Sequence, residues 1–447
     1  MNELPSGWTT ATLGEICHKP KYGWTTSATA SRPAVFKLLR TSDMSKRSLD
    51  WNEVPYASAI PAEPADFTVC KGDIFISRAG ANAGVTVLIE TQPPKALFAS
   101  YLIRLRPKLP STELFLKYFL QSAHYWNQIL RSRLGIAQPN INATKLAELS
   151  VPLPPLAEQR RIVAEIEKHF TRLDEAERMT AQARTRARAF RRSAIRNTCA
   201  PFSSRKHVPF GQLITSLRNG ISEKPTAASG FPILKISAVR PFRLHLPERR
   251  YLADASLHEG FELKENDLLF TRYNGNPQLV GVCARVPVLN ETLYYPDKLI
   301  RARLPTGHDA RFYELMFNGG KASEHIRSRV RTTAGQSGIS GADIKSAPVP
   351  VVTGEEQTAA ADLFEQTLLY SDRVDSELKA LITRTPHLRQ AILAKAFSGQ
   401  LVPQDPNDEP ASVLLERIRA ERDREIAGPL KSRRTRLRTR QAALQSK

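Results

Sequence analysis

The sequence contains an internal repeat, and this feature limits the possible folds more than any other. Residues 72–78 (GDIFISR) return as residues 266–272 (NDLLFTR). Residues 97–107 (LFASYLIRLRP) return as residues 293–305 (LYYPDKLIRARLP), with a short insertion. A chain that carries the same pattern twice is expected to fold into two similar units.

The register of the repeat becomes constant in the second part of each copy, from the pair Gln138 and Gln336 onward. Insertions are therefore expected in the front of each copy, where short apolar runs alternate with turn residues. In the first copy, residues 69–76 and 85–89 predict strands around a turn. Residues 112–133 carry apolar side chains at helical spacing and predict a packed helix.

Each copy ends in a long segment of helical pattern. After the proline-rich strip Val151–Pro155, residues 158–197 contain no proline or glycine, and apolar or small residues recur at steps of three and four. This pattern predicts an amphipathic helix of about 40 residues, near 60 Å long at ~1.5 Å per residue, that begins near Ala157. The second copy has a matching stripe, but Pro386 is expected to kink or interrupt its helix.

An isolated helix of this kind would expose its apolar stripe to water. The two helices are therefore expected to pair within the chain as an antiparallel coiled coil, because an internal partner has the higher effective concentration. Pairing between two chains remains the alternative. The side chains expected to pair the helices or to dock a partner are Ile162, Ile166, Phe170, Leu173, Phe364, Leu368, Leu378, Leu381, Leu388 and Ile392.

The expected fold class is α+β, with two similar mixed α/β globules, two long helices packed as an antiparallel coiled coil, and pseudo-twofold symmetry. The globules are expected to hold target-recognition surfaces, because two basic domains on a rigid spacer match two sites on one face of duplex DNA. The expected domains are a first globule (1–155), a first helical spacer (156–199), a second globule (200–353), a second spacer (354–398), a C-terminal segment with a short helix (399–428) and a basic, disordered tail (429–447).

The charge of the chain indicates a polyanionic ligand. Lys and Arg number 65 against 44 acidic residues, for a net charge of +21, and nucleic acid is the first ligand to consider for such a chain. No run approaches the ~18 apolar residues of a membrane span, and the first residues lack the pattern of a secretory signal, so a cytoplasmic location is expected.

Two repeated polar clusters are the candidates for DNA contact, because Arg, Asn and Gln side chains can make paired hydrogen bonds to base edges. The cluster that follows the repeated strand comprises Arg78 and Asn82 in the first copy and Arg272, Tyr273, Asn274 and Asn276 in the second. The other cluster comprises Arg131, Arg133, Gln138 and Asn140, with Arg329, Arg331 and Gln336 as counterparts. The alternative interpretation of the first cluster is solvated loop residues, and that of the second cluster is residues that cap helices or form turns.

A third basic feature lies at the end of the first predicted helix. Six arginines crowd this end without an acidic residue between them: Arg184, Arg186, Arg188, Arg191, Arg192 and Arg196. They are expected to follow a DNA backbone or to meet an acidic partner, and a solvated helix surface is the alternative.

Several long motifs resemble one family, the specificity subunits of type I restriction-modification systems. The likeness is carried by residues 4–8 (LPSGW) with 13–16 (LGEI), by residues 151–163 (VPLPPLAEQRRIV) and by residues 388–404 (LRQAILAKAFSGQLVPQ). The sequence departs from the family pattern at residues 351–354 (VVTG), where Pro-Pro-Leu is expected.

The resemblance implies a subunit that binds an asymmetric, bipartite target in double-stranded DNA. It also implies docking of two methyltransferase subunits and, through them, of restriction subunits. S-adenosylmethionine, ATP and Mg²⁺ would then be bound by those partners, with no cofactor on this chain.

Motifs for catalysis are not found in the sequence. There is no Asn/Asp-Pro-Pro-aromatic loop of an adenine methyltransferase and no GxxxxGK[ST] phosphate loop, so a non-catalytic subunit is expected. The four cysteines are scattered without a CxxC, which argues against a metal site. The alternatives are a self-contained modification enzyme, a coiled-coil scaffold with nucleic-acid-binding domains, or a specificity subunit of a related modification-based phage-defence system.

Overall fold

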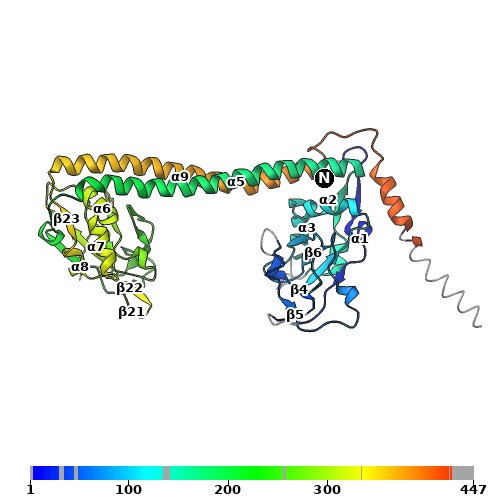
Figure 1. Cartoon of the computed structure of the whole chain (residues 1–447), viewed down its shortest axis with the longest axis horizontal. Coiled ribbons are helices and arrows are strands. Elements are labelled where there is room, and N and C mark those ends of the chain that lie inside the picture. The colour runs from blue at the N-terminus through cyan, green and yellow to red at the C-terminus, as the bar shows by residue number, and fades with distance from the viewer. Residues whose placement is uncertain are drawn as a thin grey trace, which may run out of the picture. The chain divides into compact units, whose positions relative to one another are not determined.

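The computed structural model describes residues 4–29, 35–44, 49–133, 141–254, 258–333, 335–421 and 423–424. The chain divides into two compact units, shown in Figure 1. Unit 1 combines Met1–Arg178 with Ile382–Lys447, and unit 2 is Met179–Leu381. Each unit therefore consists of one α+β globule together with part of each of two long helices.

The globule of unit 1 is built mainly from two four-stranded sheets. Its strands are β1 (Thr9–Thr12), β2 (Lys21–Tyr22), β3 (Ala28–Thr29), β4 (Lys37–Leu39), β5 (Tyr56–Ala57), β6 (Ile74–Ser77), β7 (Thr86–Leu88), β8 (Ala96–Phe98), β9 (Leu102–Leu105) and β10 (Ser150–Leu153). Its short helices are α1 (Leu13–Ile16), α2 (Glu113–Phe119), α3 (Ala123–Arg133) and α4 (Ala143–Ala147). The sheet orders are β2-β9-β6-β7 and β3-β5-β4-β8, and β1 pairs with β10.

The globule of unit 2 has its own set of elements. Its strands are β11 (His207–Pro209), β12 (Ser216–Asn219), β13 (Phe231–Leu234), β14 (Val239–Arg240), β15 (Arg243–Leu244), β16 (Arg249–Leu252), β17 (Leu268–Thr271), β18 (Tyr273–Asn274), β19 (Cys283–Arg285), β20 (Leu299–Arg303), β21 (Arg331–Thr333), β22 (Gln336–Gly338) and β23 (Pro348–Pro350). Its helices are α6 (Ala310–Gly319), α7 (Lys321–Arg329) and α8 (Gly341–Lys345).

The two units repeat one order of elements, as the internal repeat predicts. The sheet β12-β20-β17-β19 of unit 2 matches β2-β9-β6-β7 of unit 1, and β11 pairs with β23 as β1 pairs with β10. The predicted strands around a turn are confirmed, because β6 and β7 are antiparallel neighbours. Gly80 and Gly84 in that turn have φ of 76° and 93°, a backbone conformation that glycine adopts at least cost.

The segment 112–133 forms two helices instead of the single helix that the spacing predicts. The first, α2, ends at Phe119, and the second, α3, begins at Ala123. Ser122 explains the break, because its Oγ donates to the carbonyl of Phe119 at 2.6 Å and accepts from the backbone N–H of Tyr125 at 3.3 Å. A serine that bonds the backbone on both sides favours a helix terminus over a helix interior.

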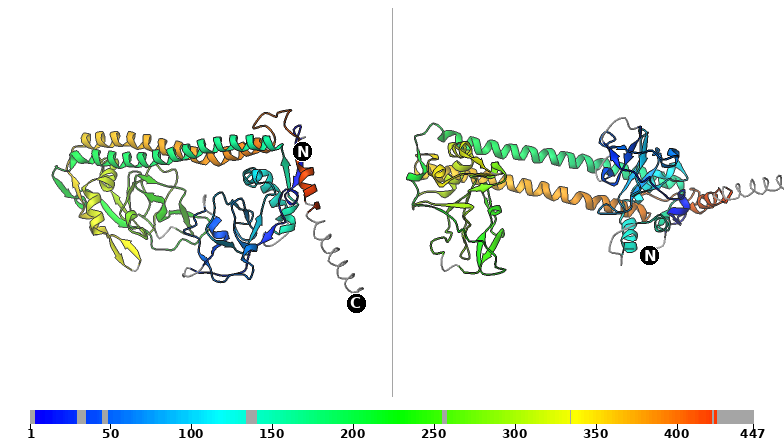
Figure 2. Two further views of the ribbon diagram at one scale, coloured as in Figure 1. Left: turned by 45° about the vertical axis from the view of Figure 1, so that its right-hand side comes forward. Right: turned by 90° about the horizontal axis from the view of Figure 1, so that it is seen from below.

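Two 44-residue helices follow the globules, α5 (Leu156–Cys199) and α9 (Gly354–Phe397), and Figure 2 shows them in two further views. The expected helix of about 40 residues is confirmed, and it begins one residue before Ala157. Pro386 lies inside α9 and does not interrupt it, so of the two expected effects, a kink or an interruption, the interruption is absent. Thr385 and Leu393 are buried on either side of the proline, so tertiary packing holds the helix where one backbone hydrogen bond is missing.

The helices run antiparallel within each unit. In unit 2, Arg184 pairs with Asp375 at 3.1 Å and Arg191 pairs with Asp372 at 2.6 Å. Residue numbers therefore increase along α5 in the direction in which they decrease along α9. In unit 1, Arg389 of α9 pairs with Asp174 of α5 at 2.6 Å. The fold class is thus α+β with paired long helices, as expected.

The predicted helix-pairing side chains fall into three groups. Ile162, Ile166 and Phe364 are buried in the cores, and Phe170, Leu173, Leu368, Leu378 and Ile392 are partly buried. Leu381 and Leu388 are each 50% exposed, so of the two expected roles, helix pairing and partner docking, their exposure favours partner docking. The buried face of α9 runs through Thr385 and Leu393. Because threonine is not an apolar residue, the hydrophobic pattern of the sequence does not show this part of the buried face.

The C-terminal segment completes the core of unit 1. Residues 411–421 are helical, and Leu414, Leu415 and Ile418 are buried in the same cluster as Phe115 and Phe397. The backbone N–H of Ala411 donates to the carbonyl of Gly7 at 2.9 Å. The first and last described parts of the chain therefore pack together, while the predicted basic tail lies outside the described residues.

One buried carboxyl in unit 2 gives a pH-dependent prediction. Burial raises the pKa of Glu314 to about 7, and its Oε1 accepts a hydrogen bond from the backbone N–H of Arg285 at 2.8 Å. Because this pKa lies above the ordinary value of 4.5, the free energy of unfolding falls as pH rises between those values. Glu314→Gln is expected to stabilise unit 2 by on the order of 2 kcal/mol at pH 8 and to have almost no effect at pH 4.

Thermal unfolding of the variant at the two pH values tests this expectation. Glu324→Gln is the control, because Glu324 is exposed on α7 in the same unit. An equal stabilisation of the Glu314 variant at both pH values would contradict the assignment.

Candidate nucleic-acid interface

Arg78 and Arg272 occupy equivalent places in the two units, one residue after β6 and β17. The N–H of Arg78 donates to the carbonyl of Tyr101 at 3.0 Å, and that of Arg272 donates to the carbonyl of Lys298 at 2.8 Å. The carbonyl of Arg78 accepts from the N–H of Ile141, and that of Arg272 from the N–H of Ile339. Both arginines therefore join the central sheet to the segment that precedes α4 or α8.

An ion pair between a buried aspartate and a partly exposed arginine anchors the strand that leads to each of these two arginines. Asp73 is fully buried and accepts from Nε and Nη2 of Arg106 at 2.7 and 3.0 Å. Asp267 accepts from the same two atoms of Arg303, each at 2.6 Å. The hydrogen bonds from these guanidinium groups to the carboxylates raise the pKa of both Arg106 and Arg303. Bidentate pairs of this kind fix the strands rigidly in both units.

Each of the two arginines lies over a tyrosine ring. The guanidinium carbon of Arg78 lies 4.8 Å from the ring centre of Tyr22, and that of Arg272 lies 4.7 Å from the ring centre of Tyr273. Nε of Arg272 is buried and has no hydrogen-bond partner among the described residues. Stacking holds the guanidinium plane in place before any ligand binds, which lowers the entropic cost of a bidentate contact.

In unit 2 the two predicted clusters form one surface. Strand β18 pairs with β22, and β22 pairs with β21, so Tyr273 lies opposite Gly338 and Asn274 opposite Ser337. A hollow of about 480 Å³ lies on this small sheet. Its lining includes Tyr273, Arg331 and Gln336.

The remaining predicted residues of unit 2 lie on the same sheet or close to it in the chain. Asn276 is exposed, Arg329 is exposed at the end of α7, and Arg331 and Gln336 are exposed on the hairpin. The Oδ1 atoms of Asn274 and Asn276 accept from backbone N–H groups two residues on, so these oxygens are engaged in turns. The alternative interpretation of both asparagines was solvated loop residues, and the sequence did not indicate this turn role.

In unit 1 fewer of the predicted residues are described. Asn82 is partly buried, and its Nδ2 lies 3.5 Å from the carbonyl of Thr41. Arg131 is exposed near the end of α3. The side chain of Arg133 and the residues Gln138 and Asn140 lie outside the described part of the chain. The meeting of the two clusters is therefore observed in unit 2 alone.

The structure adds residues that sequence reasoning missed. Tyr22 lies on β2, far in sequence from Arg78, and only the sheet brings the two together. Tyr101, 63% exposed, and the exposed Lys298 occupy equivalent positions beside the two arginines. The aligned repeat could have indicated this last pair, because both lie in the segments 97–107 and 293–305.

Among the described residues, no group of three or more His, Cys, Asp or Glu could hold a metal ion. The four cysteines are free, and burial raises the pKa of the Cys17 thiol to about 12. In the described part of the chain, no helix is long and apolar enough to cross a membrane.

Comparison with known proteins gives the class of the chain. Residues 5–182 match the family described as type I restriction modification DNA specificity domain. The EcoKI specificity subunit of Escherichia coli K12 is 30% identical over 449 residues, covering 94% of this chain and 96% of the relative. The StySPI specificity subunit of Salmonella potsdam is 24% identical with the same coverage. The chain therefore belongs to the family of type I restriction-enzyme specificity subunits.

Solved structures agree with the fold. A structure from work on complex assembly and conformational transition of the type I R-M system has a TM-score of 0.68 at 18% identity, covering 90% of this chain and 100% of that chain. The HsdS subunit from Thermoanaerobacter tengcongensis has a TM-score of 0.52 at 19% identity, covering 89% and 98%. At these identities the likeness supports the fold alone.

Proposed function

We propose that this specificity subunit reads an asymmetric, bipartite target in double-stranded DNA and catalyses no step itself. The observation that carries the proposal is the pair of equivalent, stacked arginines, Arg78 and Arg272, in different surroundings. Arg78 has Tyr101 beside it, whereas Arg272 has Lys298. Two similar frames with different polar side chains are suited to reading two different base sequences.

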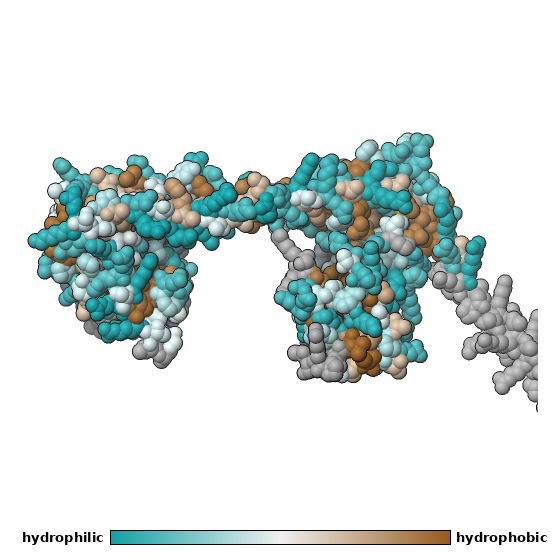
Figure 3. Space-filling model, in the orientation of Figure 1, coloured by the Kyte–Doolittle hydropathy of each residue, from teal (hydrophilic) through white to brown (hydrophobic). Residues whose placement is uncertain are grey.

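The partners in this proposal are two methyltransferase subunits, and through them restriction subunits, in the cytoplasm. Figure 3 shows apolar patches on the otherwise hydrophilic surface of the long helices. On α9 in unit 2, Leu363, Leu369 and Tyr370 are 60%, 68% and 64% exposed. Large exposed apolar side chains on a helix support a partner-docking role. Leu381 and Leu388, which are also exposed on α9, are proposed for the same partner-docking role. S-adenosylmethionine, ATP and Mg²⁺ would be bound by the partners.

A map of methylated adenines in a host genome, with the gene present and then deleted, tests the function. The methyltransferase partner is kept in both strains. Methylation at one asymmetric bipartite motif is expected to disappear on deletion. Unchanged methylation, with the protein expressed and soluble, would reject the role in specificity and would favour a scaffold.

Arg272 provides a sharper test at one half of the target. Arg272→Lys keeps the charge but removes the planar fork, so discrimination between target and single-base variants is expected to fall by about 1–3 kcal/mol. The loss is expected in the half-site that unit 2 reads, and Arg78→Lys is expected to affect the other half. Competition binding of the methyltransferase complex to duplexes with single-base changes measures both effects.

A control variant and a second substitution of Arg272 allow the result of this experiment to be interpreted. Arg250→Lys is the matched control, because Arg250 is exposed on β16 in the same unit. If Arg272→Lys leaves discrimination intact while Arg272→Gln weakens all sequences equally, Arg272 contacts phosphate and the base-reading role is wrong.

A further inference from the structure

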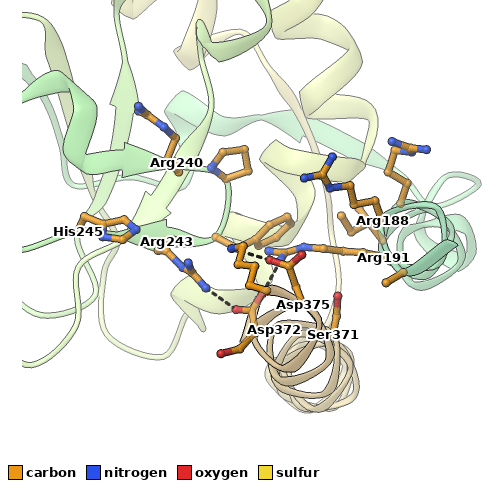
Figure 4. Close-up of a pocket in the computed structure, with 15 residues that line it drawn as sticks. Arg188, Arg191, Arg240, Arg243, His245, Ser371, Asp372 and Asp375 are labelled. Atoms are coloured by element: carbon orange, nitrogen blue, oxygen red, sulfur yellow. Dashed lines mark hydrogen bonds and ion pairs between the residues drawn. The ribbon is translucent and has the colours of Figure 1, made fainter. Parts of the chain in front are cut away.

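A groove of about 570 Å³ lies in unit 2 between the two long helices and the hairpin of β14 and β15. Figure 4 shows Arg240 and Arg243 on the hairpin, Arg188 and Arg191 on α5, and Asp372 on α9. Apolar side chains also line it, including Ile195, Pro241 and Phe242. No residue of the two repeated polar clusters lines this groove, whereas Arg188, Arg191 and Arg192 belong to the arginine-rich end of α5, for which a DNA backbone or an acidic partner is the expected ligand.

The hairpin is held firmly against the helices. Phe242, at its two-residue turn, has φ of 61°, a left-handed conformation that costs a non-glycine residue about 1–2 kcal/mol. Its ring centre lies 4.8 Å from that of Phe364 on α9 and 6.0 Å from the guanidinium carbon of Arg191. These contacts offset the backbone cost, so one wall of the groove is formed before any ligand arrives.

The carboxylates of the groove are already neutralised. Asp372 accepts from Arg191 at 2.6 Å and from Arg243 at 2.8 Å. Asp375 pairs with Lys379 at 2.6 Å and with Arg184 at 3.1 Å, and the hydrogen bond from Lys379 is the main cause that lowers its pKa. Both acids are thus shared between two cations.

Three further arginines line the groove without a carboxylate partner among the described residues: Arg188, Arg192 and Arg240. Arg188 and Arg192 are four residues apart on α5, about 6 Å along the helix axis, and both are exposed. Nη1 of Arg240 donates to the carbonyl of Val239 at 2.8 Å, and this hydrogen bond holds the guanidinium group at the edge of the groove. The groove therefore has an excess of positive charge around an apolar floor.

The position of the groove separates it from the candidate reading surface. Figures 1 and 2 show β21 and β22 at the end of unit 2 that points away from α5 and α9, whereas the groove lies against these helices. Arginine together with aromatic side chains such as Phe242 is also the composition that is enriched at protein interfaces. Both observations favour a protein ligand over the DNA that the hairpin would read.

We propose that this groove binds an acidic peptide segment of a partner protein. Two acidic side chains one helical turn apart would match Arg188 and Arg192, and a third would reach Arg240. The apolar side of the segment would cover Phe242 and Ile195. The inference rests on the proposed function only in that a partner subunit is expected to carry the segment.

The test uses the full chain and a fluorescein-labelled peptide of about four helical turns, with Glu at four-residue spacing on one side and Leu on the other. The groove variant carries Arg188→Gln, Arg192→Gln and Arg240→Gln. The control variant carries Arg186→Gln, Arg196→Gln and Arg250→Gln, three exposed arginines of the same unit outside the groove. Both variants lose the same charge, so non-specific attraction to the basic chain falls equally.

At physiological salt, the groove variant is expected to weaken peptide binding by roughly tenfold or more relative to the control variant. Unchanged melting temperatures verify that both variants are folded. Equal affinities of the two variants would overturn the proposal. A selective loss of duplex DNA binding by the groove variant, with peptide binding intact, would also overturn it and assign the groove to a DNA backbone.

The result of the peptide-binding experiment is independent of the result of the methylation experiment that tests the proposed function. Peptide binding at the groove is measured without methylation, and the methylation map is measured without the peptide. Failure of either experiment therefore leaves the other to be judged on its own result.

Discussion

Asp267→Ala is expected to lower the free energy of unfolding of unit 2 by about 3–5 kcal/mol. The side chain is buried, accepts two bonds from Arg303, and also accepts from the backbone N–H of Lys264 at 2.8 Å. Alanine would remove the acceptor of all three bonds, so that Arg303 would keep only its bond to the carbonyl of Glu262 and the N–H of Lys264 would lose its side-chain partner. Because Arg272 follows the same strand, recognition of one half-site is expected to fail together with stability.

Urea unfolding measures the stability loss, and hydrogen exchange assigns it to unit 2. Glu265→Ala is the matched control, since Glu265 is exposed two residues before Asp267. Asp73→Ala is expected to produce the same loss in unit 1. Similar stabilities of the Asp267 and Glu265 variants would show that the ion pair does not hold the strand.

Phe397→Ala is the second change with a large expected effect, about 3–5 kcal/mol in unit 1. The ring is 7% exposed and packs edge-on against Phe115 and Phe119, with ring centres 5.4 and 5.5 Å away. Its removal leaves a cavity where the end of α9 meets the globule. Release of the C-terminal segment is expected to follow, because that segment packs into the same cluster.

Limited proteolysis of residues 399–421, together with thermal unfolding, reports both effects. Phe190→Ala serves as the control, because Phe190 lies on α5 and is 53% exposed. Its substitution is expected to change stability by less than about 0.5 kcal/mol. A comparable loss from both substitutions would contradict the packing described for Phe397.

Local patterns in the sequence predicted much of the fold. The repeated segments became equivalent strands, and the proline-free stretch became α5 almost to the residue. The break at Ser122 was missed because apolar spacing continues through it, while the side chain bonds the backbone on both sides. The interruption expected at Pro386 is absent because helix continuity there depends on tertiary packing, which residue type alone does not report.

The sequence indicated individual residues of the candidate site, but it did not indicate the surface that some of them form. Arg272 and Gln336 were singled out separately, but their meeting depends on the pairing of β18 with β22, which are far apart in the chain. The stack of Arg78 on Tyr22 depends on long-range sheet order in the same way. Pairings of this kind follow from the register between strands and leave no periodic signal in one sequence.

The small sheet of β18, β22 and β21 has a consequence for how the protein can evolve. Arg331 and Gln336 are exposed on this sheet, and neither belongs to the hydrophobic core of unit 2. Exchanges at such positions alter stability little, because they remove no core contact. Under the proposed function, substitutions at this edge would change the DNA preference while the ion pair of Asp267 and Arg303 keeps the scaffold intact. A change of target would then not need to pass through an unfolded intermediate.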